Sequence, residues 1–158
     1  MAKVLFVIAK KDFRDIEYFA PKAIMENAGH SVETASNGKV GESAFGADGG
    51  EVKIDINIAD TDAGDFNAVV FVGGPGTLEN LDNEQSYNLA KETVAKNKIL
   101  AAICIAPVIL AKAGVLKGKK STVWGSDIDV IQDGNIITAN GPKAAEKFGE
   151  MIKKSLVR

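Results

Sequence analysis

Two patterns of apolar and polar residues alternate along the chain, one typical of buried strands and the other of amphipathic helices. Residues 3–9 (KVLFVIA) form a continuous apolar run, which indicates a strand covered on both faces. Residues 15–29 then place apolar side chains at helical spacing and end at Gly29, a residue common just after helices. The same order recurs. This alternation predicts strands at 30–36, 67–76 (ending in a glycine-rich turn), 98–104, 119–125 and 135–140. It also predicts helices at 83–97, 107–116 and 141–156.

Residues 38–64 break this alternation. They are rich in glycine and acidic residues around one alternating apolar stretch, which predicts loops with a short strand or hairpin. Elsewhere, buried strands alternating with helices are typical of a parallel sheet with helices on both faces. We therefore expect one open three-layer α/β domain spanning residues 1–158, since the sequence contains no internal repeat and no linker.

Composition narrows the possible partners. The chain has 158 residues, 46% of them apolar and 25% charged, and a net charge of −2, which fits a globular protein with no general attraction to nucleic acid or to anionic membranes. The first apolar run, of about six residues, is too short for a signal peptide or a membrane span. With a single cysteine and therefore no intrachain disulfide, a reducing cytoplasm is the expected location.

The sequence also argues against bound cofactors. There is one histidine, His30, so a metal site built from His and Cys clusters is not expected, although carboxylate-only sites remain possible. Neither the phosphate-loop pattern nor the dinucleotide fingerprint is present. We expect neither a metal nor an organic cofactor.

The cysteine, Cys104, lies at the predicted carboxyl end of a strand, where open parallel sheets bind ligands. Small residues, Ala102 and Ala106, stand two positions to either side, as a nucleophile on a sharp strand-to-helix turn requires. The following helix directs its N–H groups at the sulfur, and we expect this to lower the pKa of the thiol. The Ile105 N–H is a candidate oxyanion donor. The alternative is an inert core cysteine.

Two further places could complete such a site. Gly73 and Gly74 end the preceding strand, which should lie close to the strand of Cys104, and the Gly74 N–H is a candidate second oxyanion donor. Asp12, Asp15 and Glu17 follow the first strand. Glu17 is flanked by apolar residues, so it is the acid most expected to point inward, where the like charge of a neighbouring thiolate should raise its pKa. Asp15 is expected to be solvated, and a solvated Glu17 is the alternative.

The chain resembles the ThiJ/PfpI superfamily, which contains the parkinsonism-associated deglycase, the PfpI-type intracellular peptidases and glyoxalase-like enzymes. The resemblance implies a flavodoxin-like α/β sandwich and a homodimer. It also implies that Cys104 is the nucleophile, that Glu17 contacts the thiol, and that the Gly74 and Ile105 amides are the oxyanion donors. The segments that carry it, in order along the chain, are DIEYFAPKAIMENAGHSVETAS, DFNAVVFVGGPG, ILAAICIAP, AGVLKGKKST and DGNIITANGP.

Departures from the family pattern limit what the resemblance implies. PfpI-type peptidases carry a histidine directly after the cysteine, where this chain has Ile105, so no Cys–His pair is available and proteolysis is disfavoured. Other members place a histidine where this chain has Trp124, and the segment after Trp124 is shorter than usual. His30 is expected at the surface, at the start of the second strand. Trp124, Asn140 and Gly73 remain possible pocket residues, each with a structural alternative.

Two functions of different classes follow. The first is a cofactor-free cysteine enzyme of the glyoxalase or deglycase kind, whose partner is a small reactive carbonyl or its glycated adduct, with Glu17 moving the proton. The second is a redox-responsive stress protein or holdase chaperone that uses the same oxidisable Cys104. A PfpI-type peptidase or hydrolase ranks below both, and a domain that keeps only a binding surface is a further alternative.

Overall fold

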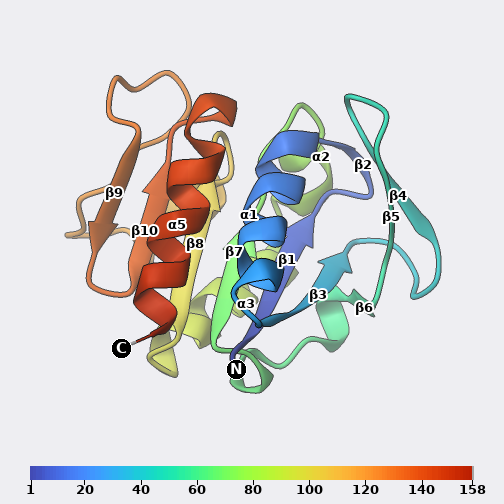
Figure 1. Ribbon diagram of the computed structural model, residues 1–158, viewed down its shortest axis with the longest axis horizontal. Coiled ribbons are helices and arrows are strands. Elements are labelled where there is room, and N and C mark those ends of the chain that lie inside the picture. Colours follow the sequence, from blue (N-terminus) through green and yellow to red (C-terminus); the bar gives the residue numbers. More distant parts are fainter. Residues whose placement is uncertain (158) are drawn as a thin grey trace.

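In the computed structural model, which describes residues 1–157, a seven-stranded sheet forms the centre of the molecule (Figure 1). The strands run in the order β6-β3-β1-β7-β8-β10-β9, and every neighbouring pair is parallel except β10 and β9. This is the predicted mainly parallel α/β sandwich. The bounds are β1 (Lys3–Ile8), β3 (Ser31–Ser36), β6 (Ile56–Asn57), β7 (Ala68–Phe71), β8 (Ile99–Ile103), β9 (Val130–Asp133) and β10 (Ile136–Ala139).

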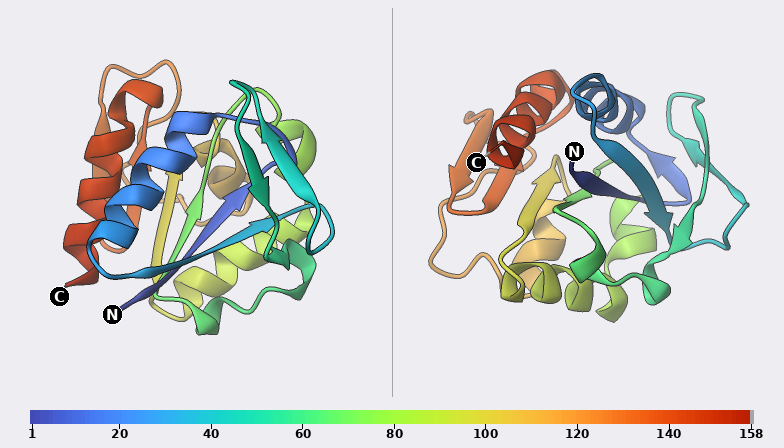
Figure 2. Two further views of the ribbon diagram at one scale, coloured as in Figure 1. Left: turned by 45° about the vertical axis from the view of Figure 1, so that its right-hand side comes forward. Right: turned by 60° about the horizontal axis from the view of Figure 1, so that its bottom comes forward.

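Helices cover both faces of this sheet (Figure 2). On one face α1 (Asp15–Asn27) packs beside α5 (Ala145–Leu156), and on the other α3 (Glu84–Ala95) packs beside α4 (Pro107–Lys112). A short helix, α2 (Thr77–Leu81), follows β7. Single turns of 3₁₀ helix occur at Ile58–Asp60, Ala63–Asp65 and Pro142–Ala144. None of the helices in residues 1–157 combines the length and the apolar character that crossing a membrane would require.

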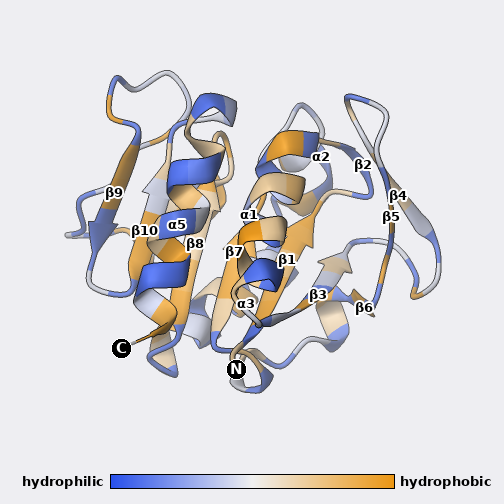
Figure 3. Cartoon of the chain, in the orientation of Figure 1, coloured by the Kyte–Doolittle hydropathy of each residue, from blue (hydrophilic) through white to orange (hydrophobic). Residues whose placement is uncertain are grey.

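The continuous apolar runs supply one core on each face of the sheet. Along β1, Val4 and Phe6 face the α1/α5 layer, whereas Leu5 and Val7 face the α3/α4 layer. Successive strand residues point to opposite faces, so a strand between two layers of helices must be apolar at every position. Figure 3 shows this contrast between apolar central strands and the hydrophilic outer surface of α5.

A second, three-stranded sheet lies beside the first and consists of β2 (Lys11–Phe13), β4 (Ser43–Gly46) and β5 (Glu51–Lys53), in the order β2-β4-β5. The β4–β5 pair is the hairpin predicted within residues 38–64. The short β2 was not predicted, because three residues carry too little alternation to be recognised.

The predicted strand at 119–125 is wrong. This segment runs without a strand, although the Trp124 N–H donates to the Cys104 carbonyl (2.8 Å) and the Thr122 N–H donates to Thr138 Oγ1 (2.9 Å). The physical reason is that β10 already has β8 on one edge and β9 on the other, so its backbone partners are taken. The predicted last helix begins at Ala145, after a 3₁₀ turn.

Candidate active site

Cys104 occupies a strained turn directly after β8. Its backbone has φ 66, in the left-handed region that non-glycine residues rarely adopt, and its N–H donates to the Ala139 carbonyl of β10 (2.9 Å). Ala102 and Ala106, two residues to either side, are fully buried. These features confirm the sharp turn predicted around Cys104, with a side chain that is 8% exposed.

Glu17 reaches Cys104 across the end of an intervening strand. It lies in the first turn of α1 and is fully buried, and its Oε1 accepts the Gly73 N–H (3.1 Å). In the sheet, β7 lies between β1 and β8. The two side chains meet over the end of β7 because Gly73 has no side chain there. A Cβ on Gly73 would lie 2.6 Å from Cys104 Cβ and 2.7 Å from Glu17 Oε1.

The environment of Glu17 favours its protonated form. Burial raises its pKa from 4.5 to about 7, against the opposing effects of the Cys104 thiol, the Gly73 N–H and the positive charge of Arg14. Within residues 1–157, Glu17 Oε2 is buried without a hydrogen-bond partner. The direction of the shift agrees with the prediction from the sequence, but its cause is burial and not the charge of a thiolate.

The expected lowering of the Cys104 pKa is wrong. Burial, followed by the negative charge of Glu17 and its hydrogen bond, raises the pKa of the thiol to about 12, and these effects exceed the opposing effects of the Ile105 N–H and Arg14. The helix after the turn, α4, has only six residues, so its dipole is small. Between about pH 7 and about pH 12 the pair therefore holds one proton, which is on the Cys104 sulfur. Use of Cys104 as a nucleophile would therefore require its proton to move to Glu17.

Two backbone N–H groups are placed to bind a developing negative charge. The Ile105 N–H bonds to the Cys104 sulfur, and the Gly74 N–H makes no hydrogen bond within residues 1–157. Gly74 has φ 132, and a Cβ there would lie 2.4 Å from the Arg14 backbone nitrogen, so only glycine fits. Both predicted donors line the same cavity as the thiol.

The cavity has a volume of about 350 Å³, enough for a small molecule. Trp124, which is 60% exposed, forms part of the cavity wall. This agrees with the hypothesis that Trp124 is a pocket residue. Arg14 also lines the cavity and was missed at the sequence level. The lining residues within the described part of the chain are Arg14, Gly74, Pro75, Leu78, Cys104, Ile105, Trp124 and Pro142.

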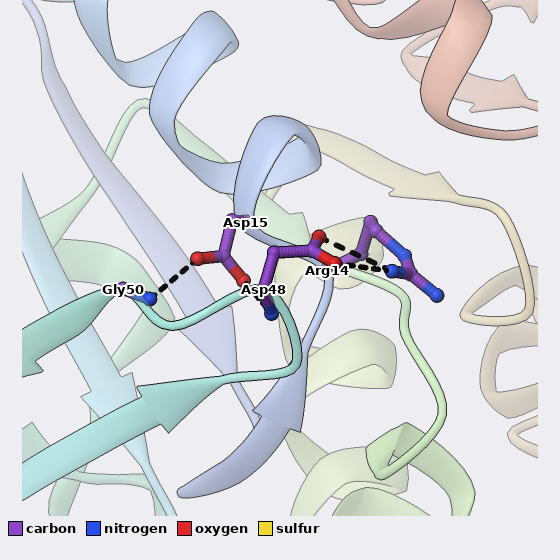
Figure 4. A network of polar contacts seen from close by, with 4 residues as sticks. All are labelled: Arg14, Asp15, Asp48 and Gly50. Atoms are coloured by element: carbon purple, nitrogen blue, oxygen red, sulfur yellow. Dashed lines mark hydrogen bonds and ion pairs between the residues drawn. The ribbon is translucent and has the colours of Figure 1, made fainter.

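A polar network holds Arg14 in place (Figure 4). Its Nη1 donates to both carboxylate oxygens of Asp48, each 3.1 Å away. Asp15, which was expected to be solvated, is half-buried and binds backbone N–H groups. Its carboxylate accepts the N–H groups of Asp48 (3.0 Å) and Gly50 (2.6 Å), which ties the loop between β4 and β5 to the start of α1.

Three other residues considered from the sequence, Gly73, Asn140 and His30, are not among the residues that line this cavity. Asn140 lines a neighbouring cavity of about 400 Å³, which shares Trp124 and Pro142, and its Nδ2 donates to the Ser126 carbonyl (2.8 Å). His30 accepts the Ala2 N–H on Nδ1 (2.9 Å), just before β3 begins. His30 therefore lies at the amino ends of the parallel strands, whereas Cys104 lies at their carboxyl ends. No cluster of three or more His, Cys, Asp or Glu side chains in residues 1–157 could hold a metal ion.

Fold and site together define an α/β protein with a cysteine on a nucleophile elbow and a buried glutamate against the thiol. Comparison with known proteins agrees, since the sequence profile of the DJ-1/PfpI family matches residues 2–155. The chain belongs to the DJ-1/PfpI family.

Relatives and solved structures extend this assignment. A protein of Methanocaldococcus jannaschii is 42% identical over 98% of this chain and 82% of its own. A deglycase of Pyrococcus furiosus, PfpI, is 32% identical over 89% of this chain and 90% of its own. Among solved structures, a ThiJ/PfpI domain protein of Brachyspira murdochii superimposes with a TM-score of 0.93, at 33% identity, over 98% of this chain and 96% of its own.

Proposed function

We propose that this protein is a cofactor-free cysteine enzyme that acts on small reactive carbonyls or their adducts, as a glyoxalase or deglycase does. One observation carries the proposal: the fully buried carboxyl of Glu17 faces the Cys104 thiol at the edge of a small-molecule cavity. A relative named as a deglycase supports it.

The chemistry follows from the positions of the groups. A carbonyl carbon in the cavity is attacked by the Cys104 sulfur while Glu17 accepts the thiol proton, and the electron pair of the C=O bond moves to oxygen. The Gly74 and Ile105 N–H groups stabilise that oxygen. Glu17, with a pKa of about 7, can then return the proton to it. The result is a hemithioacetal, formed without a cofactor.

The same geometry weighs against the other functions considered. A PfpI-type peptidase needs a histidine beside the cysteine. In this chain Ile105 occupies that position, and His30 lies at the opposite, amino ends of the parallel strands. A redox sensor needs an exposed thiolate. Cys104 is instead buried, with a thiol pKa of about 12.

The test is turnover of methylglyoxal and water to lactate by the purified protein, alongside Cys104→Ser and Glu17→Gln variants. We expect the wild type to turn over. Loss of the proton-accepting group in Glu17→Gln should lower kcat by about 10²- to 10⁴-fold, and Cys104→Ser should be inactive. Folding of each variant is checked by circular dichroism. Equal turnover by the wild type and Cys104→Ser would exclude a cysteine enzyme of this kind.

A further inference from the structure

The cavity around Cys104 has an uneven charge distribution. Among its lining residues, in the part of the chain that the structure describes, Arg14 is the one charged side chain, and the others are glycine, apolar residues and the cysteine. We propose that Arg14 binds a carboxylate on the substrate, so that the preferred substrates are small carbonyl compounds that also carry an acid group. This assignment of the substrate class rests on the function proposed above.

The backbone and the neighbouring acids fix the position of Arg14. Its N–H donates to the Gly73 carbonyl (2.8 Å) at the end of β7, next to the oxyanion donors. Its side chain is held by Asp48, and Asp48 is held in turn by Asp15. A guanidinium that is already ordered loses little conformational entropy when it binds a ligand.

The guanidinium of Arg14 still has N–H groups with which it can bind a ligand. Asp48 uses only Nη1, and no other side-chain nitrogen of Arg14 has a hydrogen-bond partner within residues 1–157. The Asp48 side chain is 52% exposed and does not line the cavity, whereas Arg14 does. The free edge of the planar fork matches a carboxylate, to which it can donate two parallel hydrogen bonds.

The position of the charge also suits the reaction. When an aldehyde that carries a carboxylate enters, the Sγ–C bond forms, the C=O electron pair moves to oxygen, and the thiol proton passes through Glu17 to that oxygen. No atom is lost and no oxidant or reductant is needed. The carboxylate takes no part in the bonding changes, so Arg14 can hold it throughout and orient the carbonyl toward Cys104.

Two alkylating agents of nearly equal size test this without any turnover. Iodoacetate is an anion and iodoacetamide is neutral, and both alkylate Cys104 with loss of iodide. The quantity measured is the ratio of their second-order rate constants at one pH and low ionic strength. Any change in the protonation of the thiol affects both rates equally, so the ratio reports only recognition of the charge.

We expect Arg14→Gln to lower the iodoacetate-to-iodoacetamide ratio by about tenfold, and Arg14→Lys to lower it less, since Lys keeps the charge but not the fork. The matched control is Lys143→Gln, which removes a cation that lines the neighbouring cavity but not that of Cys104. It should change the ratio less than twofold. Asp48→Asn, which frees Nη1, should raise the ratio.

Equal ratios in the wild type and Arg14→Gln would overturn the proposal, as would a fall of the same size in Lys143→Gln, which would show a general field effect. If Arg14→Gln does not fold, Asp48→Asn decides, and an unchanged ratio there overturns the proposal. Failure of the enzyme function is a separate outcome, because it appears as absent turnover while the alkylation ratio still depends on Arg14.

Discussion

At the scale of single residues, Glu17 shows how burial adjusts a common side chain to a task. In water its carboxyl would be ionised at neutral pH. In the folded protein its pKa rises to about 7, because neither bulk water nor a nearby salt bridge compensates a buried charge. A group that binds and releases a proton with equal ease near neutrality is what a reaction that first removes a proton and then returns it requires.

This raised pKa has a cost in stability, and its sign can be derived. Between pH 4.5 and about 7 the folded protein binds the Glu17 proton and the unfolded chain does not, so the free energy of unfolding falls as pH rises. The Glu17 contribution lost over this window is about 3 kcal/mol. Urea unfolding at pH 4.5 and pH 8 measures it.

The matched variant is Glu17→Gln, which keeps an oxygen to accept the Gly73 N–H but does not titrate. We expect the wild type minus Glu17→Gln difference in unfolding free energy to become more negative by about 3 kcal/mol between pH 4.5 and pH 8. A difference that stays constant with pH would contradict a raised Glu17 pKa.

The sequence predicted Cys104, Glu17, Gly74 and Ile105 at the site but missed Arg14. The first four carry local signals, namely a turn between small residues, an acid among apolar neighbours and a glycine pair after a strand. Arg14 carries none, because its place depends on Asp48, 34 residues away in a loop. The predicted lowering of the Cys104 pKa was wrong for a related reason. The position of Cys104 after a strand can be recognised in the sequence, but its depth of burial cannot.

At the scale of elements, the site depends on strand ends that approach more closely than side chains would allow. Gly73, two residues after the end of β7, lies between Glu17 and Cys104, and a Cβ there would also lie 2.6 Å from the Ile103 carbonyl oxygen. Gly73→Ala should therefore destabilise the protein by about 1–3 kcal/mol and separate the acid from the thiol. Chemical denaturation and the rate of Cys104 alkylation measure the two effects.

The control is Gly38→Ala. A Cβ at Gly38 would lie 2.7 Å from Ile54 Cδ1, a methyl group that can rotate away, so the cost should stay below about 1 kcal/mol and alkylation should be unchanged. If Gly73→Ala and Gly38→Ala lose the same unfolding free energy, then the loss in Gly73→Ala is not caused by backbone crowding.

The elements also show where reading a sequence reaches its limit. The buried parallel strands were predicted because continuous apolar runs leave few alternatives. The segment 119–125 contains Thr, Val and Trp, which are common in strands, and yet it forms no strand. The edge of β10 that this segment would need for pairing is occupied by β9. Competition for one edge of a sheet is a property of the assembled fold and not of either segment.

At the scale of the whole molecule, two cores on opposite faces of one sheet stabilise the protein. Phe148 of α5 is fully buried among side chains of α1 and the central strands. Phe148→Ala should lower the unfolding free energy by about 3–5 kcal/mol, because the cavity adds to the loss of buried apolar surface. Val40→Ala, at a side chain that is 66% exposed, should change it by less than about 0.5 kcal/mol. Thermal unfolding checks both, and a cost below 1 kcal/mol for Phe148→Ala would show that this face is not a packed core.

The order of the strands across the sheet has a consequence for the growing chain. During synthesis the Glu17 carboxyl emerges long before Cys104, and β1 cannot acquire its neighbour β7 until residues 68–71 have been made. The thiol meets its proton acceptor only when β8 has taken its place on the far side of β7. An incomplete chain therefore cannot hold the Glu17–Cys104 pair, and the proposed reactivity toward carbonyls would begin only once the sheet is complete.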